Sequence, residues 1–159
     1  MNKKKNPKEG ETLRVMRIKN GVVIDHIPRG KAPQVLDILG IDESFTDTIT
    51  IAMNVPSSIY GRKDIVKVEN RNLKPSELNQ IALIAPTATI NIIQNFKVVK
   101  KEKAKLPKII VGSLKCPNPN CITNKEREPV QTVFIVRQTE PPVLSCKFCE
   151  RNLTSILLM

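Results

Sequence analysis

Hydrophobic and polar positions along this 159-residue chain alternate with two different periods. A period of two is typical of β-strands and predicts them over residues 13–19, 22–27, 48–55, 63–69, 88–93 and 96–99. The most regular of these segments places four apolar side chains on one face, namely Ile49, Ile51, Met53 and Val55. The dipeptide Asn20-Gly21, between the first two segments, is typical of a tight hairpin turn.

Two other segments follow a helical period. Residues 32–39 have apolar side chains at helical spacing and are followed by Gly40, a frequent helix stop. Residues 75–85 begin with Pro75, which suits a first helical turn, and end before Pro86. Two helices among five or six strands with short connections predict an α+β fold, in which a mainly antiparallel sheet forms a sandwich with two helices.

The last third of the chain has a different character. Residues 100–108 are rich in lysine and poor in apolar side chains, which predicts a linker between domains. The pattern beyond it is β-rich, so we expect a small all-β domain over 109–159, after a disordered basic tail over 1–12 and a first domain over 13–99. A domain of about fifty residues cannot readily build a sufficient core, which predicts that something else stabilises it.

All four cysteines lie in this last third, as Cys116 and Cys121 in CPNPNC and Cys146 and Cys149 in CKFC. Two close pairs with 24 residues between them are typical of a tetrahedral zinc site, because each pair supplies two thiolates from one turn. Four sulfurs leave no open position on the metal, so one zinc ion per chain would be structural and do no chemistry. Iron in the same ligand set, two disulfides and buried free thiols are the alternatives.

The net charge of +11 is concentrated in residues 1–20 and 97–108. Such a charge favours a polyanionic partner, although a solvated tail and a flexible linker explain it as simply. The start MNKKKNPKEGE lacks the apolar stretch of a signal peptide, and polar residues interrupt the longest uncharged run. We therefore expect a cytoplasmic protein without a membrane segment, in which paired cysteines favour a metal over a disulfide.

With both halves placed, the sequence resembles the regulatory chain family of aspartate carbamoyltransferase from about Leu13 to Leu158. The resemblance implies an N-terminal allosteric domain, in which two helices pack on a sheet, and a C-terminal zinc domain. It implies a non-catalytic regulatory subunit in pyrimidine biosynthesis, through which nucleoside triphosphates inhibit or activate the enzyme. The segments that carry it, in the family's order, are GVVIDHIP (21–28), TITIAMNVPS (48–57), GRKDIVKVEN (61–70), LIAPTATINII (83–93), CPNPNC (116–121) and CKFC (146–149).

The resemblance also implies a nucleotide effector site in the N-terminal domain. Asp25 is expected to meet the ribose, His26 the phosphates, and Lys67 the ribose or base. Lys101 is expected to reach the triphosphate, although the neighbouring Lys100 leaves this assignment ambiguous by one position. Without the resemblance, a lone histidine after an apolar strand is more often structural. The residues implied to line or flank the pocket are Val15, Ile18, Asn91, Ile93 and Val98.

A further implication concerns partners. The zinc domain is expected to contact the catalytic chain through Asn118, Asn120 and Glu150, although the two asparagines are equally suited to capping turns. The implied assembly is a heterododecamer of two catalytic trimers and three regulatory dimers, with the regulatory chains paired through their N-terminal domains. Which nucleotides activate and which inhibit stays open.

Parts of the sequence also suggest two other classes of function. A zinc-ribbon nucleic-acid-binding protein is the main alternative, suggested by the basic charge and the four cysteines. Against it, the four phenylalanines and one tyrosine are scattered, and most of the excess charge lies outside the cysteine region. An enzyme is not expected, because the chain has neither a GxxxxGKS/T nor a GxGxxG motif and contains a single histidine. We therefore expect no nucleic-acid partner and no catalytic residue.

Overall fold

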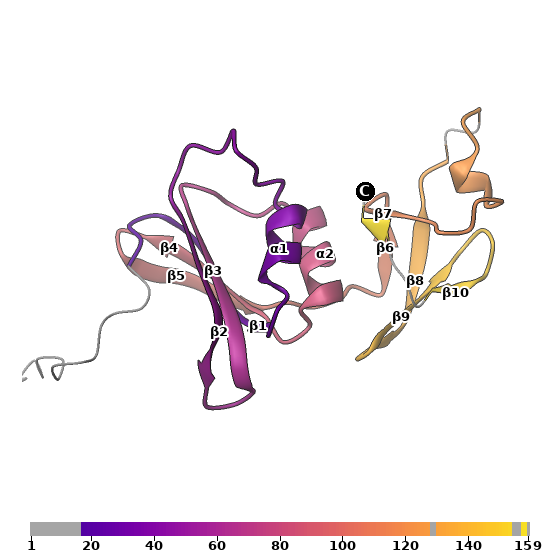
Figure 1. The fold of residues 1–159 in the computed structure, drawn as a ribbon. Coiled ribbons are helices and arrows are strands. Elements are labelled where there is room, and N and C mark those ends of the chain that lie inside the picture. The colour runs from indigo at the N-terminus through magenta and orange to yellow at the C-terminus, as the bar shows by residue number, and fades with distance from the viewer. Residues whose placement is uncertain (1–16, 128–129, 154–156, 159) are drawn as a thin grey trace, which may run out of the picture.

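The computed structural model describes residues 17–127, 130–153 and 157–158, which form two lobes (Figure 1). The elements of the N-terminal lobe are β1 (Gly21–Pro28), α1 (Ala32–Ile38), β2 (Ile49–Ser57), β3 (Gly61–Glu69), α2 (Pro75–Ile84), β4 (Thr89–Gln94) and β5 (Lys97–Lys103). Those of the C-terminal lobe are β6 (Ile109–Val111), β7 (Leu114–Lys115), the 3₁₀ turn η1 (Ile122–Asn124), β8 (Val133–Thr139), β9 (Pro142–Cys146), β10 (Asn152–Leu153) and β11 (Leu157–Leu158). Across the described residues the fold is therefore α+β, with two helices and antiparallel sheets, as predicted.

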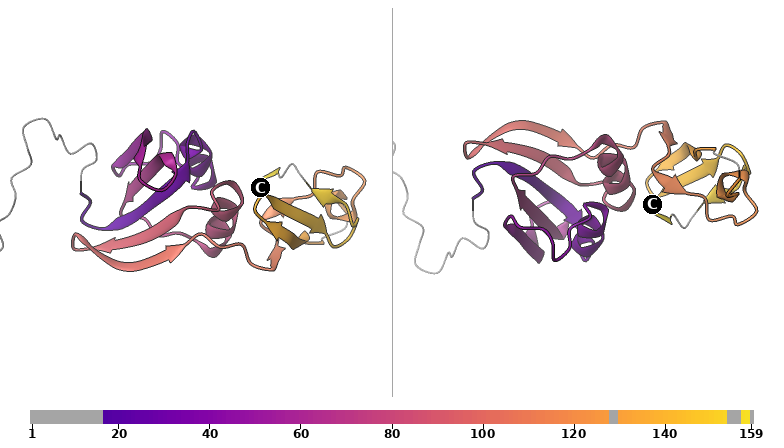
Figure 2. Two further views of the ribbon diagram at one scale, coloured as in Figure 1. Left: turned by 90° about the horizontal axis from the view of Figure 1, so that it is seen from below. Right: turned by 90° about the horizontal axis from the view of Figure 1, so that it is seen from above.

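The N-terminal lobe is built on a five-stranded antiparallel sheet of order β2-β3-β1-β4-β5. Both helices lie on the side of this sheet that faces the C-terminal lobe (Figures 1 and 2). Alternate strand residues point toward the helices and form a fully buried core with Val35 of α1 and Ile81 of α2. The strand residues of that core are Val22, Ile24, Ile27, Val66, Val68 and Ile90.

The other face of this sheet carries polar side chains in register. Lys67 of β3 lies opposite Val23 of β1, Val23 lies opposite Asn91 of β4, and Asn91 lies opposite Lys101 of β5. Because residues opposite each other in antiparallel strands project to the same face, these four side chains form one row across the sheet. Helices α1 and α2 cover the opposite face, so we call this one the open face.

A bulge in β1 interrupts the register at the end of the open face. Between Ile24 and Ile27 the pairing with β3 shifts by one residue, so that Asp25 and His26 together oppose Ile65. His26 adopts a left-handed conformation with φ of 55°. Ile24 and Ile27 both remain fully buried, which places the two residues between them on the open side.

A buried carboxylate joins α1 to the sheet. Asp64 of β3 is fully buried, and its Oδ2 atom accepts hydrogen bonds from the backbone N–H groups of Gly30 (2.9 Å) and Ala32 (3.1 Å). Its Oδ1 atom accepts a third from the backbone N–H of Asn54 in β2 (2.9 Å). One side chain thus satisfies donors at the start of α1 and at a bulge in β2.

The C-terminal lobe has a four-stranded sheet of order β10-β9-β8-β6 and a two-stranded sheet of β11 and β7. Its buried core is centred on Phe134 and includes Leu83 of α2, which comes from the N-terminal lobe. The two lobes are also joined by a hydrogen bond of 2.9 Å from Nε2 of Gln80 to the backbone oxygen of Ser113. Helix α2 therefore contributes to both cores. Within the described ranges, no helix is long and apolar enough to span a membrane.

The strand predicted over 13–19 is tested only at its end, and the hairpin turn predicted after it is wrong. Residues 13–16 lie outside the described residues, and 17–19 are not in a strand. Gly21 is the first residue of β1, with φ of +144°. A Cβ atom there would lie 2.1 Å from the backbone oxygen of Val68. Glycine is required by this close approach of β3 and not by a turn.

Two other predicted segments differ from the structure. The prediction of a regular strand over 48–55, with alternate side chains on one face throughout, is wrong. A bulge between Ala52 and Val55, where Asn54 has a φ of 57°, shifts the pairing with β3. The last strand of the N-terminal domain was predicted to end at residue 99, whereas β5 continues to Lys103. Residues 100–103 are thus part of the sheet and not of a linker, because β4 supplies a hydrogen-bonding partner for them.

Candidate functional site

The four cysteines converge from two turns of the C-terminal lobe. Cys116 follows β7, Cys121 precedes η1, Cys146 ends β9 and Cys149 precedes β10. Their sulfur atoms all lie within 4.8 Å of one another, with Cys116 and Cys149 at 3.7 Å and Cys121 and Cys146 at 3.8 Å. Four sulfurs bound at about 2.3 Å around one tetrahedral zinc ion are about 3.8 Å apart, whereas a disulfide needs about 2.05 Å. The four free thiols are therefore positioned to hold one metal ion, and the set fits zinc.

The chemical state of the thiols agrees with a metal site. Burial raises the pKa of the Cys116 thiol to about 12, so without a cation it would stay protonated. Burial acts in the same direction on Cys149, but hydrogen bonds from the Arg151 backbone and from Asn118 outweigh it and lower the pKa of Cys149 to about 7. A dication would supply the charge that the buried sulfurs need to ionise.

Hydrogen bonds hold the first cysteine loop in shape. Nδ2 of Asn124 donates to the backbone oxygens of Cys116 (2.8 Å) and Asn118 (2.7 Å), and Oγ1 of Thr123 lies 3.2 Å from the sulfur of Cys121. Oδ1 of Asn118 accepts from the backbone N–H of Asn120 (3.1 Å). Such contacts around the ligands orient a metal site, and neither Asn124 nor Thr123 was predicted.

The residues predicted to contact a partner lie in different environments. Asn118 is buried and caps the loop, which is the alternative role that its sequence position allowed. Asn120 and Glu150 are exposed. Glu150 adopts a left-handed conformation with φ of 60°, and its backbone N–H donates to the oxygen of Cys146 at 2.8 Å.

The predicted effector residues within the described part gather on the open face and at its edges. Lys67, Asn91 and Lys101 share the row described above, and Ile93 lies opposite Val98 two positions along. Ile93 is buried, whereas Val98 and Lys101 are exposed. Val15 lies outside the described residues, and Ile18 is buried just before β1.

The bulge of β1 adds two polar groups to this face. Oδ1 of Asp25 forms an ion pair with Nζ of Lys63 at 2.9 Å and also accepts from the backbone N–H of His26 at 2.6 Å. Nδ1 of His26 lies 3.3 Å from Oγ1 of Thr89, and its ring stands edge-on to that of Tyr60 at 5.8 Å. Burial lowers the pKa of Lys67, and the nearby charge of Asp25 opposes this effect.

Sequence reasoning missed Lys63, Thr89 and Tyr60 as neighbours of Asp25 and His26. The two-residue period of β3 was a usable signal for Lys63, because it places Lys63 on the same face as Lys67. Thr89 and Tyr60 carry no such signal, because they approach His26 only through the pairing of β1 with β4 and the β2–β3 hairpin.

An α+β lobe with a polar, lysine-bearing face, joined to a four-cysteine lobe, defines a class of two-domain binding proteins stabilised by a metal ion. Two family models match the chain: the allosteric domain of the aspartate carbamoyltransferase regulatory chain over residues 13–105, and the metal binding domain of the same chain over 108–156. The chain belongs to the family of aspartate carbamoyltransferase regulatory chains.

Individual relatives agree with the family models. The aspartate carbamoyltransferase regulatory chain of Methanothermobacter thermautotrophicus is 55% identical over 139 residues, which cover 87% of this chain and 88% of the relative. The regulatory chain of Pyrococcus horikoshii is 54% identical over 142 residues, 89% of this chain and 92% of the relative. That of Thermofilum pendens is 53% identical over 144 residues, 91% of each. These matches do not favour the alternative of a zinc-ribbon nucleic-acid-binding protein, and they identify a regulatory, non-catalytic chain.

Proposed function

We propose that this chain binds nucleoside triphosphates on the open face and uses a structural zinc ion to present its C-terminal lobe to the catalytic chain of aspartate carbamoyltransferase. The observation that carries the proposal is the row of Lys67, Val23, Asn91 and Lys101 across four neighbouring strands. Lysines at both ends of a row that has an amide between them suit an elongated anion with hydrogen-bonding groups.

The dimensions of the row suit such a ligand. Strands are about 4.8 Å apart, so Lys67 and Lys101 leave the sheet about 14 Å from each other. A ligand with a base and ribose at one end and phosphates at the other spans a distance of this order. The base and ribose belong near Lys67 and Asp25, and the triphosphate near Lys101. The other cations of β5 (Lys97, Lys100 and Lys103) add a positive field along the same edge.

The metal site supports a docking role for the C-terminal lobe. One zinc ion per chain would fix both cysteine turns, so that Asn120 and Glu150 project from a rigid base toward the catalytic chain. Asn118 would act indirectly, by shaping the loop. The division into an effector domain, predicted over 13–99 and extended to Lys103 by β5, and a zinc domain over 109–159 belongs to this proposal, with the connection at 104–108.

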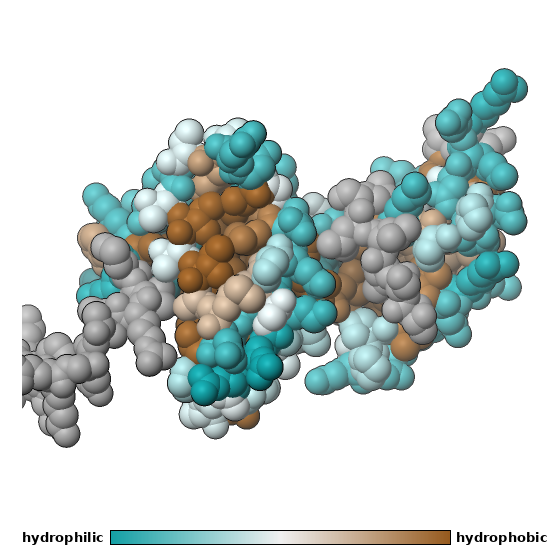
Figure 3. Space-filling view, viewed as in Figure 1, coloured by the Kyte–Doolittle hydropathy of each residue, from teal (hydrophilic) through white to brown (hydrophobic). Residues whose placement is uncertain are grey.

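The edges of the N-terminal sheet support pairing of two regulatory chains through β2. Strand β5 carries four lysines in seven residues, which protects its free edge from association. Strand β2 has no charged residue, and it exposes 43% of Ile51 and 46% of Met53. Figure 3 shows hydrophobic residues gathered on the N-terminal lobe in the region of β2 and β3. Three such dimers would join two catalytic trimers in the cytoplasm.

Regulation would follow from a difference in nucleotide affinity between two states of the assembly. Effects of this kind correspond to a coupling free energy of about 1–3 kcal/mol. A nucleotide that binds both states equally would change nothing. The chain itself needs no catalytic group for this role.

Calorimetric titration of the full chain with cytidine and adenosine triphosphates tests the effector site. We expect binding by at least one of them and a loss of about tenfold or more in Lys101→Ala, because an ionic hydrogen bond to phosphate is removed. Lys115→Ala, an exposed lysine of β7 in the other lobe, is the matched control and should bind as the wild type does. Absence of binding by either nucleotide at millimolar concentration would remove the effector-site proposal.

A further inference from the structure

The imidazole ring of His26 is held by side chains from two other parts of the N-terminal lobe. Its Nδ1 atom lies 3.3 Å from Oγ1 of Thr89 in β4, and Thr89 is buried. The ring of Tyr60 stands edge-on to it, with 5.8 Å between the centroids and 69° between the planes. Within the described part of the chain, Nε2 of His26 forms no hydrogen bond. One ring nitrogen is therefore held by the sheet, and the other is available to a ligand.

The backbone of His26 is held in an unusual conformation. Its φ of 55° lies in the left-handed region, which residues other than glycine enter at a cost. Its N–H donates to Oδ1 of Asp25 at 2.6 Å, and its backbone oxygen accepts from Oγ1 of Thr87 at 2.8 Å. Side chains on both sides thus stabilise this conformation. A costly conformation that several side chains maintain is typical of a functional site.

The charged neighbours of His26 leave its ring to a ligand. Asp25 pairs with Lys63 at 2.9 Å, and no ion pair among the described residues includes His26. Lys103 of β5 lies opposite Thr89, which adds a cation to the same end of the open face. The ring nitrogen that is available to a ligand therefore lies in a region whose charge suits phosphate groups.

Tyr60 reaches His26 from the tip of the β2–β3 hairpin, which extends beyond the neighbouring strands (Figure 1). The backbone of Tyr60 is fixed, because its N–H donates to Oγ of Ser57 (3.2 Å) and its oxygen accepts from the N–H of Arg62 (2.9 Å). The side chain is 50% exposed and belongs to neither buried core. An aromatic side chain held at an exposed turn against one other ring indicates a role in placing that ring.

The hydroxyl group of Tyr60 suggests a different role. It forms no hydrogen bond with the residues that the structure describes, so it could itself donate to a phosphate. The ring contact favours the first role, because it is the interaction that the structure contains and because edge-on aromatic pairs have a defined geometry. Removal of the hydroxyl group alone separates the two roles.

We infer that Tyr60 is a positioning residue of the effector site, which acts through His26 and does not itself contact the nucleotide. Its ring and the hydroxyl group of Thr89 hold the imidazole between them, so that Nε2 is presented to the phosphates. The inference rests on the proposed function, in which a nucleoside triphosphate binds on the open face. It makes the tip of the β2–β3 hairpin part of the effector site, although no residue of that tip was predicted to bind a nucleotide.

Calorimetric titration of the zinc-loaded full chain with cytidine and adenosine triphosphates measures the effect of Tyr60. We expect Tyr60→Leu to weaken binding about threefold to tenfold, the size expected from the loss of one aromatic pair. Tyr60→Phe keeps the ring and should bind within about twofold of the wild type. Ile59→Ala is the control, because it changes an even more exposed side chain of the same turn, and it should bind as the wild type does.

Two further readouts separate positioning from a merely structural effect. The chain contains one histidine, so the imidazole resonances in its NMR spectrum belong to His26 alone. Tyr60→Leu should shift these resonances, whereas Tyr60→Phe should leave them near their wild-type positions, because only the first variant removes the ring current of the neighbour. In a His26→Gln background, Tyr60→Leu should weaken binding no further, because the group that Tyr60 positions is gone.

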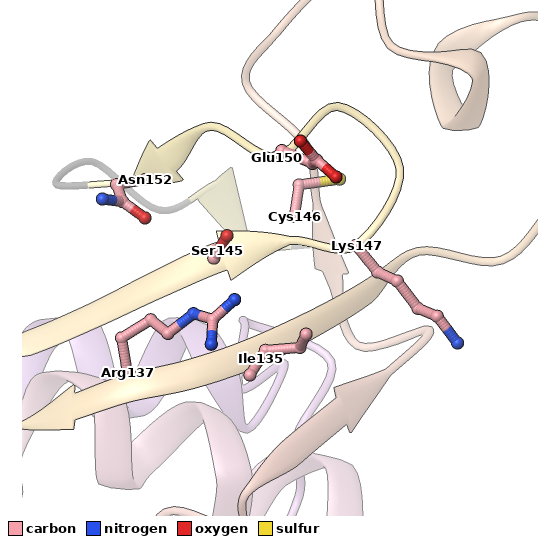
Figure 4. Close-up of a pocket in the computed structure, with 7 residues that line it drawn as sticks. All are labelled: Ile135, Arg137, Ser145, Cys146, Lys147, Glu150 and Asn152. Carbon is pink, nitrogen blue, oxygen red and sulfur yellow. The ribbon is translucent and has the colours of Figure 1, made fainter.

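A hollow lined by cations also lies in the C-terminal lobe, and it supplies a control for the place of binding. This hollow, of about 500 Å³ beside the second cysteine turn, is lined by Arg137 and Lys147 but also by Glu150. Figure 4 shows Arg137 and Glu150 on either side of Ser145. Because a carboxylate in the hollow opposes a triphosphate, Arg137→Ala should bind nucleotides as the wild type does. A loss of binding in Arg137→Ala would place the nucleotide in the wrong lobe and overturn the proposed function.

The outcomes separate the role of Tyr60 from the function on which it rests. Wild-type affinity in Tyr60→Leu, with unmoved His26 resonances, overturns the inference and leaves the effector site intact. Equal weakening in Tyr60→Phe and Tyr60→Leu would mean that the hydroxyl group contacts the nucleotide, which also overturns it. Absence of binding by the wild type removes the proposed function itself. If Tyr60→Leu lowers the midpoint of urea denaturation, Tyr60→Met, which keeps a long apolar side chain without a ring, decides the question by the same measurements.

Discussion

Lys67 lies half-buried at one end of the row on the open face, and its surroundings would make the proposed nucleotide binding depend on pH. Burial disfavours the charged ammonium and lowers the pKa of Lys67 below the ordinary 10.5, so the charged form costs folding free energy at neutral pH. This cost is present below the lowered pKa and disappears as the pH rises between the lowered pKa and 10.5. A bound phosphate or ribose oxygen favours the ammonium and opposes the shift.

Nucleotide affinity should therefore fall as the pH rises through the lowered pKa of Lys67, with proton uptake on binding in the same window. Titration calorimetry from pH 7 upward, in two buffers of different ionisation enthalpy, measures both quantities. Lys67→Gln should bind about tenfold or more weakly at pH 7, because an ionic hydrogen bond is lost, and should lose this part of the pH dependence. An unchanged pH profile in Lys67→Gln would place Lys67 outside the binding site.

Asp64 illustrates a residue whose importance is structural. Its carboxylate accepts three backbone hydrogen bonds in a fully buried position, from Gly30, Ala32 and Asn54. Asp64→Asn replaces one acceptor oxygen by an NH₂ group, which leaves at least one buried N–H unpaired and removes the charge. We expect the free energy of unfolding to fall by about 1–3 kcal/mol for each donor left unpaired. Urea denaturation measures it, and the exposed Asp37→Asn is the control, for which we expect a change within about 0.5 kcal/mol.

The sequence predicted the role of some single residues and not of others. The spacing of the four cysteines along the chain was enough to assign them to a metal site without a structure. Gly21 was recognised as a special backbone position, but the reason is a close approach by Val68, which lies 47 positions away in the chain. Asp64 had no local signal, because its three donors come from two other segments. Contacts of this kind depend on the packed fold and not on a local pattern.

At the scale of elements, the two edges of the N-terminal sheet differ in what they permit. The uncharged edge β2 can pair with a second β2, whereas lysines along β5 repel another strand. Ile51→Lys puts a charge on the β2 edge and should shift the regulatory chain from dimer to monomer, as measured by sedimentation equilibrium without catalytic chains. Val99→Lys makes the same kind of change on exposed β5 and should remain dimeric. A dimer that survives Ile51→Lys would exclude pairing through β2.

Elements themselves were predicted well where the period was regular, as for both helices and for β1, β3 and β4. The bulges in β1 and β2 were not predicted, because one extra residue in a strand leaves no mark in the local amino-acid composition. The bulge in β1 is what turns Asp25 and His26 to the same side. The extent of β5 was missed for a related reason: lysine-rich residues 100–103 have low strand propensity, and their pairing with β4 overrides it.

At the scale of the whole molecule, α2 is the element through which one lobe can act on the other. Ile81 packs in the core of the N-terminal lobe, and Leu83 of the same helix packs in the core beside the cysteines. Gln80 of the same helix donates a hydrogen bond to the backbone oxygen of Ser113 in the C-terminal lobe, and both of these residues are buried. A nucleotide bound as proposed would contact the face of the sheet opposite α2. Its effect could then reach the turn before β7 and Cys116 through the packed side chains of the sheet and of α2.

The hydrogen bond from Gln80 should matter for transmission and not for either binding site. Gln80→Leu keeps the size of the side chain but leaves the buried oxygen of Ser113 without this donor, at a cost of about 1–3 kcal/mol. Because the bond joins the lobes, the loss should loosen their relative orientation. In the complete enzyme, the change in catalytic rate on adding nucleotide should then shrink at least twofold, while nucleotide affinity of the isolated chain and zinc content stay unchanged. Gln34→Leu, on the exposed face of α1, is the control and should respond as the wild type does. A full nucleotide response in Gln80→Leu would mean that the lobes communicate through the apolar contact of Leu83 or through the chain connection after β5, and that the hydrogen bond only stabilises the fold.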